Sequence, residues 1–436
     1  MTILPEVKSE SQTATQSKMG RLVLWTAIGL IVLIVSVFVF FCRNHSSRES
    51  DVTPARLVAQ GKKLPFVIKA RAWPIQLKPI HGLEDCVTDE QLAKALHASL
   101  PFWHPPSVPS LVHELKLWGK DSVFTKEQVG GEGRTGKMMV ETLLSDSYCA
   151  DRTVILGEGK GGSYLIDSPY GIHPIQSGSY DAVEYRAESH YGKITMLMGL
   201  TNIPLSSPVT SSSGNVGSLA DILQDTVMNF HWGQELEFIG CSLAFWLPPE
   251  NTWTNQFDET FTFDDLMERL LEQPLGKGCC GGCHVPYTVV TLLRVDAEHS
   301  PILSKKTRGL AEQWLKKVVA TLEQNQLPDG GWERDWGKTG QDGLVYDDQV
   351  LDRITIVGHH LEWIAMAPEE FRPSQKFIQD AVVSVTKQID LLPPLYIRSF
   401  KTVLPCSHAA KAMCLMRNVD SFRIWLNLTT SKEVEE

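Results

Sequence analysis

Three segments of this 436-residue chain are apolar on nearly every side at helical spacing, and they constrain the fold more than any other feature. They are VPYTVVTLLRV after His284, ITIVGHHLEWIAMA around His359 and His360, and AAKAMCLM after His408. A helix without a polar face must be enclosed by other structure, because exposing any of its sides to water is unfavourable. The chain must therefore place other helices around these three.

Other helices of the sequence have a single apolar face. The clearest runs from Thr307 to Gln326, where Lys316, Lys317 and Glu323 lie off an apolar stripe formed by Leu310, Ala311, Trp314, Leu315, Val318, Val319 and Leu322. Alternation of one-faced and enclosed helices predicts an all-α fold over residues 81–430, an α/α toroid in which two helical layers form a barrel. An irregular helical bundle is the alternative, since it satisfies the same periodicities.

Helix starts and internal repeats support this prediction. Thr88 with Gln91 has capping-box spacing, and Thr262 opens TFDDLMERLLEQ with acidic residues in the first turn. QELEFI, which begins at Gln234, is echoed by HHLEWI, and each leads to a Pro-Glu stop. Repeated units of this kind bury their apolar faces only by stacking on neighbours.

The N-terminal part of the chain predicts a membrane anchor. Residues 22–41 carry no charged side chain, and 20 helical residues span about 30 Å, the thickness of a bilayer core. We therefore expect a flexible tail over residues 1–20, a single-pass transmembrane helix over 21–43 and a stalk over 44–80. Such an order predicts a protein of the cell membrane whose large domain lies outside the cytoplasm.

Composition excludes one class of partner. The net charge is −10, and no stripe of Lys and Arg is interleaved with aromatic residues, so nucleic acid is not an expected partner. The nine cysteines are too sparse for a disulfide scaffold, and their odd number leaves at least one thiol unpaired within the chain.

Several motifs resemble those of known families. QLPDGGW, from Gln326 to Trp332, fits the core of the QW motif and resembles the terpenoid cyclase and protein prenyltransferase superfamily of α/α toroids. The combination of TFDDLMERLL, CCGGCHVPY, LPDGGWERDW and PCSHAAKAM is similar to a family of bacterial membrane-anchored proteins over roughly residues 140–420. The resemblance implies a fold and no activity. The acidic run of the squalene-type cyclases has no counterpart here with the right spacing.

A set of histidines and glutamates is the first candidate site. His residues recur at the start of apolar segments, and convergence of these helix ends at one mouth of a barrel would create a metal or acid/base site. The candidate catalytic residues are His190, Glu235, Glu237, His284, His360 and His408, and the candidate ligands of a divalent metal are His284, His360 and His408. Read singly, each histidine could instead be a capping residue.

The segment from Cys280 to His284 is the second candidate site. It reads C-x-x-C-H, the attachment signature of c-type haem, in which Cys280 and Cys283 would bind the porphyrin and His284 the iron. The same run could be a reactive dithiol, or simply a glycine turn that caps a helix.

Three function classes follow from these observations. The first is a membrane-tethered domain whose cavity, lined by His and Glu, binds a ligand or performs metal-assisted chemistry on it. The second is a structural or interaction scaffold without catalysis, and the third is a redox protein that carries haem. The sequence identifies neither the ligand nor the oligomeric state.

Overall fold

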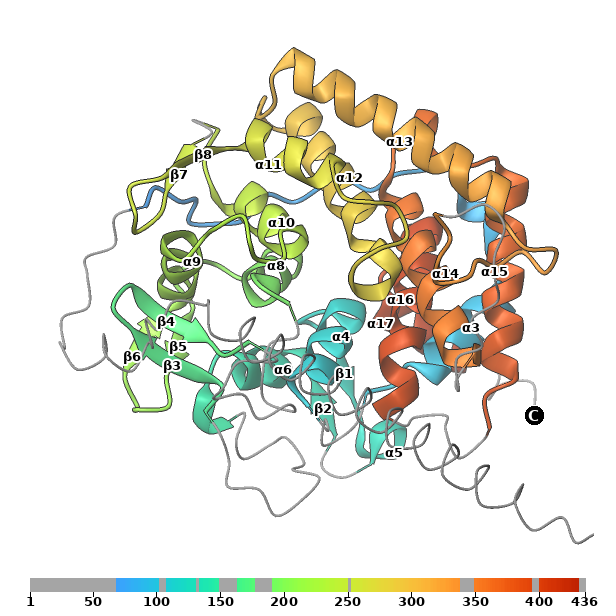
Figure 1. Ribbon diagram of the computed structural model, residues 1–436. Coiled ribbons are helices and arrows are strands. Elements are labelled where there is room, and N and C mark those ends of the chain that lie inside the picture. Colours follow the sequence, from blue (N-terminus) through green and yellow to red (C-terminus); the bar gives the residue numbers. More distant parts are fainter. Residues whose placement is uncertain are drawn as a thin grey trace, which may run out of the picture. The chain divides into compact units, whose positions relative to one another are not determined.

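The computed structural model describes residues 68–101, 107–130, 133–148, 163–176, 190–249, 252–337, 349–393 and 400–430. All of them belong to one compact unit that begins at Gly61. Helices dominate this unit, with short strands between them (Figure 1).

Six helices contact one another in a closed cycle, which we call the inner cycle (Figure 1). Each of them contacts the next, and the last contacts the first: α4 (Val108–Trp118), α8 (Lys193–Leu200), α10 (Glu237–Trp246), α12 (His284–Glu298), α14 (Gln349–Met366) and α16 (Phe400–Arg417). The three segments predicted to be enclosed fall in α12, α14 and α16. In α12 every residue from His284 to Asp296 is buried, which confirms the enclosure inferred from its missing polar face.

A second set of helices packs against the outside of the inner cycle. These are α3 (Asp89–Ala98), α6 (Gly136–Leu143), α9 (Leu219–Met228), α11 (Phe263–Leu271), α13 (Lys305–Asn325) and α15 (Gln375–Asp390). Helix α13 buries one stripe, as its periodicity predicts, but Leu310 at the edge of that stripe is 40% exposed. The remaining helical elements are α5 (Lys126–Val129), α17 (Ser421–Thr430), η1 (Glu84–Cys86), η2 (Cys279–Gly282) and η3 (Glu369–Phe371).

Four two-stranded antiparallel hairpins lie between the helices. They pair β1 (Val123–Phe124) with β2 (Arg134–Thr135), β3 (Leu165–Ser168) with β4 (Gly171–Pro174), β5 (Pro208–Thr210) with β6 (Val216–Ser218), and β7 (Thr252–Thr254) with β8 (Thr260–Thr262). Three of the hairpins end on the N-cap residue of the next helix: Thr135 for α6, Ser218 for α9 and Thr262 for α11. The hydroxyl that ends each strand therefore also begins a helix.

The predicted fold class, an all-α chain with a transmembrane helix followed by an α/α toroid, was wrong. The described residues include the four hairpins, whose short strands carry too little periodic pattern to be recognised in the sequence. Among these residues no helix combines the length and the apolarity needed to cross a membrane. The anchor predicted at residues 21–43 lies outside the described part of the chain.

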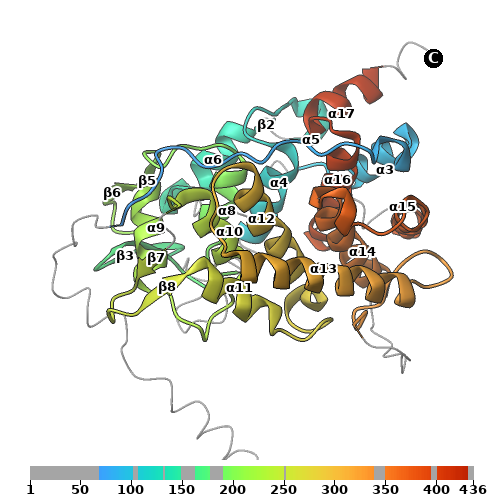
Figure 2. The ribbon, with the colours of Figure 1, turned by 90° about the horizontal axis from the view of Figure 1, so that it is seen from above.

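The N-terminal segment, residues 68–83, crosses the C-terminal ends of three inner helices (Figure 2). The Ile75 amide donates to the carbonyl of Phe245 in α10 at 3.1 Å, and the Gln76 side chain donates to the carbonyl of Gly199 in α8 at 2.8 Å. The Lys78 amide donates to Glu298 at the end of α12 at 2.9 Å. Carbonyls in the last turn of a helix lack partners within the helix, so this segment satisfies the Phe245 carbonyl, which α10 leaves unpaired.

The QW-like stretch joins α13 to its neighbours. The side chain of Gln326 donates to the carbonyls of Gly330 and Phe377, each at 2.9 Å, and the Trp332 indole donates to the carbonyl of Leu322 at 2.9 Å. Gly330 has φ +91°, and a Cβ there would meet the Asp380 carbonyl oxygen at 2.2 Å. The motif therefore serves packing between α13 and α15.

Candidate metal centre

Five buried histidines from five parts of the inner cycle form one row, which we call the histidine row. His190 precedes α8, His284 begins α12, His359 lies in α14, His408 in α16 and His113 in α4. In that order, successive ring centroids are 4.9, 4.8, 3.6 and 4.8 Å apart. The histidines are far apart in the sequence, and the closed cycle of helices brings them together.

Glu235 holds one end of the histidine row. Its carboxylate lies 2.7 and 2.8 Å from Nδ1 of His190, so this nitrogen carries the proton and donates it to Glu235. Burial alone would raise the pKa of Glu235, but His190, and after it His284, lower it to about 2. Glu235 is therefore ionised at neutral pH, and Nε2 is the nitrogen of His190 that is left for another partner. Burial and the charge of Lys193 would lower the pKa of His190, but Cys279 and Glu235 raise it above its ordinary value.

The thiol of Cys279 lies beside that second nitrogen. Cys279 Sγ is 3.9 Å from Nε2 of His190 and 3.8 Å from Sγ of Cys280. The neighbouring Cys280 thiol, and after it His190, lower the pKa of Cys279 to about 4, although burial opposes the shift. A thiolate next to an imidazole nitrogen is a pair that soft divalent metals bind.

The turn η2 directs these thiols toward the histidines. Cys280, Gly281 and Gly282 all have left-handed backbone conformations, with φ of 49°, 62° and 69°. A Cβ on Gly281 would lie 2.7 Å from the carbonyl oxygen of Arg334, so the turn requires glycine there. Cys280 adopts this conformation at a cost of about 1–2 kcal/mol, a strain typical of functional sites.

His284 carries an unsatisfied polar atom at the same end of the row. Its Nδ1 is buried and has no hydrogen-bond partner among the described residues. The nearest carboxylate oxygen, on Glu235, is 3.8 Å away, beyond hydrogen-bond length. Leaving such an atom unpaired costs about 1–3 kcal/mol, and a bound ion would remove that cost.

A second Glu–His pair lies at the other end of the row. Glu362 Oε2 is 2.9 Å from Nδ1 of His408, and Glu362 Oε1 is 2.6 Å from Nζ of Lys116. Burial would raise the pKa of Glu362, but Lys116 and His408 lower it to about 2. The ring of His359 packs on that of His408, and burial together with the charge of His408 keeps the pKa of His359 well below 6.5.

Three overlapping groups have the donor atoms and the proximity that a metal ion needs. Within each group the donor atoms lie within 4.8 Å of one another. The first group is His190, Glu235, Cys279 and His284, the second is Cys280, His284 and His359, and the third is His359, Glu362 and His408. The first group has the most donors. Nitrogen, sulfur and carboxylate together are the ligands of zinc, whose tetrahedral geometry puts nitrogen and sulfur about 3.5 Å apart. The observed 3.9 Å between His190 and Cys279 is slightly longer, so the residues fit a zinc ion with a small closure.

Most of the site residues expected from the sequence meet here, and three do not. His190, Glu235, His284 and His408 lie in the row or beside it. His360 points elsewhere: its Nδ1 accepts the Trp363 indole N–H at 3.1 Å, and its Nε2 is 3.5 Å from Sγ of Cys283. Adjacent residues of a helix differ by about 100° in direction, so His359 takes the position expected for His360.

Glu237 and Cys283 are the other two expected residues that stay apart. Burial, and after it the charge of Glu235, raises the pKa of Glu237 to about 7, and Glu237 belongs to none of the three groups. Alignment of QELEFI with HHLEWI pairs Glu237 with Glu362, yet the row uses Glu235. Glu235 precedes α10, which begins at Glu237, so helical spacing does not govern its direction.

Five residues of the site were not predicted from the sequence: His113, Lys116, Cys279, His359 and Glu362. A signal was present for two of them, because Lys116 and Glu362 are charged residues among apolar neighbours of their helices and must be paired when buried. Their contact at 2.6 Å joins α4 to α14. Cys279 carried no separate signal, since the C-x-x-C-H pattern begins one residue later.

The geometry of Cys280 and Cys283 does not fit a shared haem. Cys283 is 1% exposed and faces His360, whereas Cys280 lies with His284 and His359. Both thiols would have to reach the same porphyrin edge, and His284 would have to face its iron. The residues present therefore fit a small ion better than a porphyrin.

Comparison with known proteins does not narrow the choice: no family model, no curated protein and no solved structure matches the chain. The resemblance to terpenoid cyclases and to bacterial membrane-anchored proteins stays a prediction.

Proposed function

We propose that this protein binds a zinc ion at the Glu235 end of the histidine row and uses it for hydrolysis. The proposed ligands are His190 Nε2, Cys279 Sγ and His284 Nδ1. The observation that carries the proposal is the buried, unpaired Nδ1 of His284 beside the ionised Glu235 and the Cys279 thiol.

Glu235 has two roles in this proposal. First, it accepts a hydrogen bond from Nδ1 of His190 and so orients Nε2 toward the metal, an arrangement common behind metal-bound histidines. Three protein ligands would leave a fourth position for water, and zinc lowers the pKa of such a water to about 7. The carboxylate oxygen 3.8 Å from His284 would then be near enough to take up a proton.

The first experiment measures zinc in the purified full-length protein by elemental analysis, then repeats thermal unfolding with EDTA and with added zinc. We expect one zinc per chain at this end of the row, and a higher unfolding temperature with zinc. At zinc concentrations about 100 times the Kd, the stabilisation is about 2.7 kcal/mol.

Matched variants separate the site from general effects of losing a histidine. His284→Ala should lose the zinc-dependent rise in unfolding temperature, whereas His360→Ala should keep it, because His360 contacts Trp363 and Cys283 instead. Equal zinc responses of the two variants would refute the site. An absorbance scan of the same protein should show no Soret band.

Hydrolysis is tested separately with p-nitrophenyl acetate, a reporter ester that needs no specific recognition. Zinc-loaded protein should cleave it faster than EDTA-treated protein, and His284→Ala should abolish the difference. Equal rates with and without zinc would leave zinc binding intact and would contradict the hydrolytic part of the proposal.

A further inference from the structure

A cavity of about 370 Å³ lies between the inner cycle and the N-terminal segment. Its walls come from that segment and from all six helices of the inner cycle, and they include Leu77, Phe245, Tyr287, Met366 and Leu415. This volume is within the range of ligand sites in proteins, which is about 300–1,000 Å³. At about 30 Å³ for each water-sized group, the cavity would hold a ligand of roughly a dozen non-hydrogen atoms.

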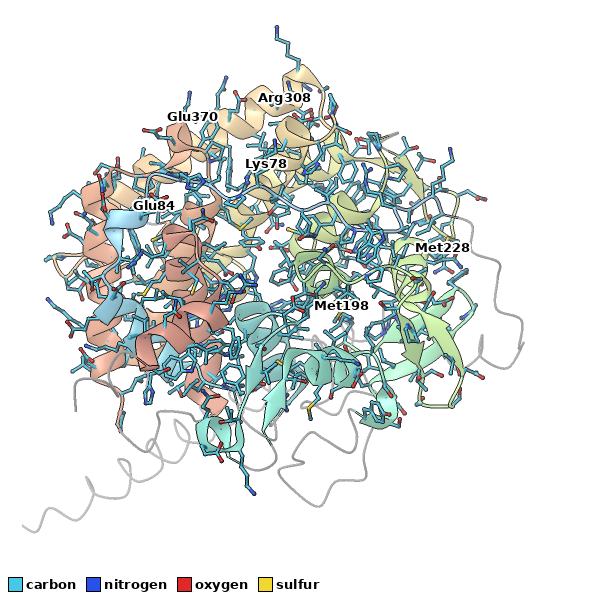
Figure 3. All side chains as sticks on the ribbon, turned by 180° about the vertical axis from the view of Figure 1, so that it is seen from behind. Lys78, Glu84, Met198, Met228, Arg308 and Glu370 are labelled. Carbon is cyan, nitrogen blue, oxygen red and sulfur yellow. The ribbon has the colours of Figure 1, made fainter. Side chains whose placement is uncertain are left out.

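The N-terminal segment closes one side of this cavity and is fixed at several points. Besides its bonds to α8 and α10, the Lys78 carbonyl accepts a hydrogen bond from the Arg294 guanidinium, and His299 Nε2 lies 3.0 Å from the Gln76 carbonyl oxygen. Lys78 is labelled in Figure 3, which views the molecule from the side on which this segment runs. The cavity is therefore a built feature of the fold.

The charged side chains of the cavity wall leave one positive charge in excess, because Lys78, Lys411 and Asp420 form no ion pair among the described residues. Lys116 pairs with Glu362 at 2.6 Å, and Arg294 pairs with Glu298 at 2.6 Å. Lys411, half-buried in α16, forms no ion pair or hydrogen bond among the described residues. Burial lowers the pKa of Lys411, although the neighbouring Cys414, Glu362 and Asp420 oppose the shift.

The remaining wall is mostly apolar, which restricts the ligand further. An anion with two charges would leave one charge uncompensated in a poorly hydrated space, whereas a single charge neutralises Lys411. Phosphate recognition also relies on several donors or on an arginine fork, and the one arginine of this wall is already paired. A single carboxylate on an apolar body matches both the charge and the walls.

We propose that this cavity binds a small organic monocarboxylate with an apolar body, its carboxylate on Lys411 and its body against Leu77, Phe245 and Met366. The site does not rest on the zinc proposal, because none of the zinc ligands lines the cavity. Glu362 stands between the two sites: α14 carries His359, Glu362 and Met366 along one face, the first in the row and the last in the cavity wall.

The experiment uses full-length protein in EDTA and octanoate as the probe, below its micelle-forming concentration. Isothermal titration should give one saturable site per chain. Octanol and octylammonium have the same apolar body without the negative charge, and each should bind at least tenfold more weakly.

Variants of the lysine complete the test. Lys411→Met should weaken octanoate binding at least tenfold, Lys411→Arg should restore most of it, and Lys306→Met, which removes an exposed lysine outside the cavity, should change nothing. Absence of saturable octanoate binding, equal binding of octanol, or unchanged binding to Lys411→Met would each overturn the proposal. Because zinc is absent throughout, these outcomes are independent of the metal centre.

Discussion

The Lys116→Met substitution tests whether the Glu362 end of the histidine row is an ion pair that stabilises the fold. Lys116 and Glu362 have side chains that are 7% and 2% exposed, and their charged atoms are 2.6 Å apart. Methionine keeps most of the lysine volume and removes the charge. Glu362 would then stay buried with His408 as its remaining hydrogen-bond partner.

The magnitude follows from the pKa of Glu362. Burial would raise that pKa, but Lys116 and His408 lower it from 4.5 to about 2. Each unit by which the pKa is lowered corresponds to about 1.4 kcal/mol, so the shift of Glu362 stabilises the folded state by about 3 kcal/mol at neutral pH. Loss of one partner of a buried pair typically costs about 3–5 kcal/mol, which agrees with this value.

The sign of the pH dependence is fixed by the same shift. A carboxyl whose pKa is lowered by folding stabilises the protein above its unfolded pKa, and this contribution is lost as the pH falls from 4.5 toward 2. We therefore expect Lys116→Met to lower the free energy of unfolding by about 3 kcal/mol at pH 7, with a smaller deficit below pH 4.5.

The assay is urea unfolding in EDTA, so that no metal compensates Glu362. The double variant Lys116→Met/Glu362→Gln serves as control, because it leaves no unpaired charge and should be more stable than Lys116→Met alone. A deficit below about 1 kcal/mol for Lys116→Met, or a double variant as unstable as the sum of the single ones, would refute the reasoning.

Four further predictions concern the turn, helix α13 and the metal. Gly281→Ala should destabilise the protein by about 2 kcal/mol or more in urea unfolding, because alanine is strained at φ +62° and its Cβ would meet the Arg334 carbonyl oxygen at 2.7 Å. Gly309→Ala, in an open position of α13, should instead stabilise it by about 0.5–1 kcal/mol, and a loss of stability there would contradict the helix assignment. Cys279→Ser should weaken zinc binding at least tenfold in competition with a fluorescent chelator, whereas Cys283→Ser, whose thiol faces His360, should retain it. Chelation of the purified protein should lower its unfolding temperature, and zinc but not magnesium should restore it, because the donors include sulfur and nitrogen.

The sequence indicated which residue types could make a site without indicating which of them meet. Histidines at the starts of apolar segments identified His190, His284 and His408, because a polar ring in an enclosed helix requires a partner. The sequence offered no basis for choosing between His359 and His360. Adjacent residues of α14 differ by about 100° in direction, and this difference places His359 in the row. Lys116 and Cys279 entered the site through contacts between elements distant in the chain.

The sequence by itself determined the local features: the capping box at Thr88, the apolar stripe of α13 and the enclosure of α12, all of which depend on spacing within one helix. The hairpins could not be predicted from the sequence, because strands of two to four residues are too short to show an alternation of apolar and polar side chains. Only the tertiary structure decided that four helices and the segment before α8 present histidines in one row. Closure of the inner cycle is a long-range property, set by how helix faces pack, and no local pattern records it.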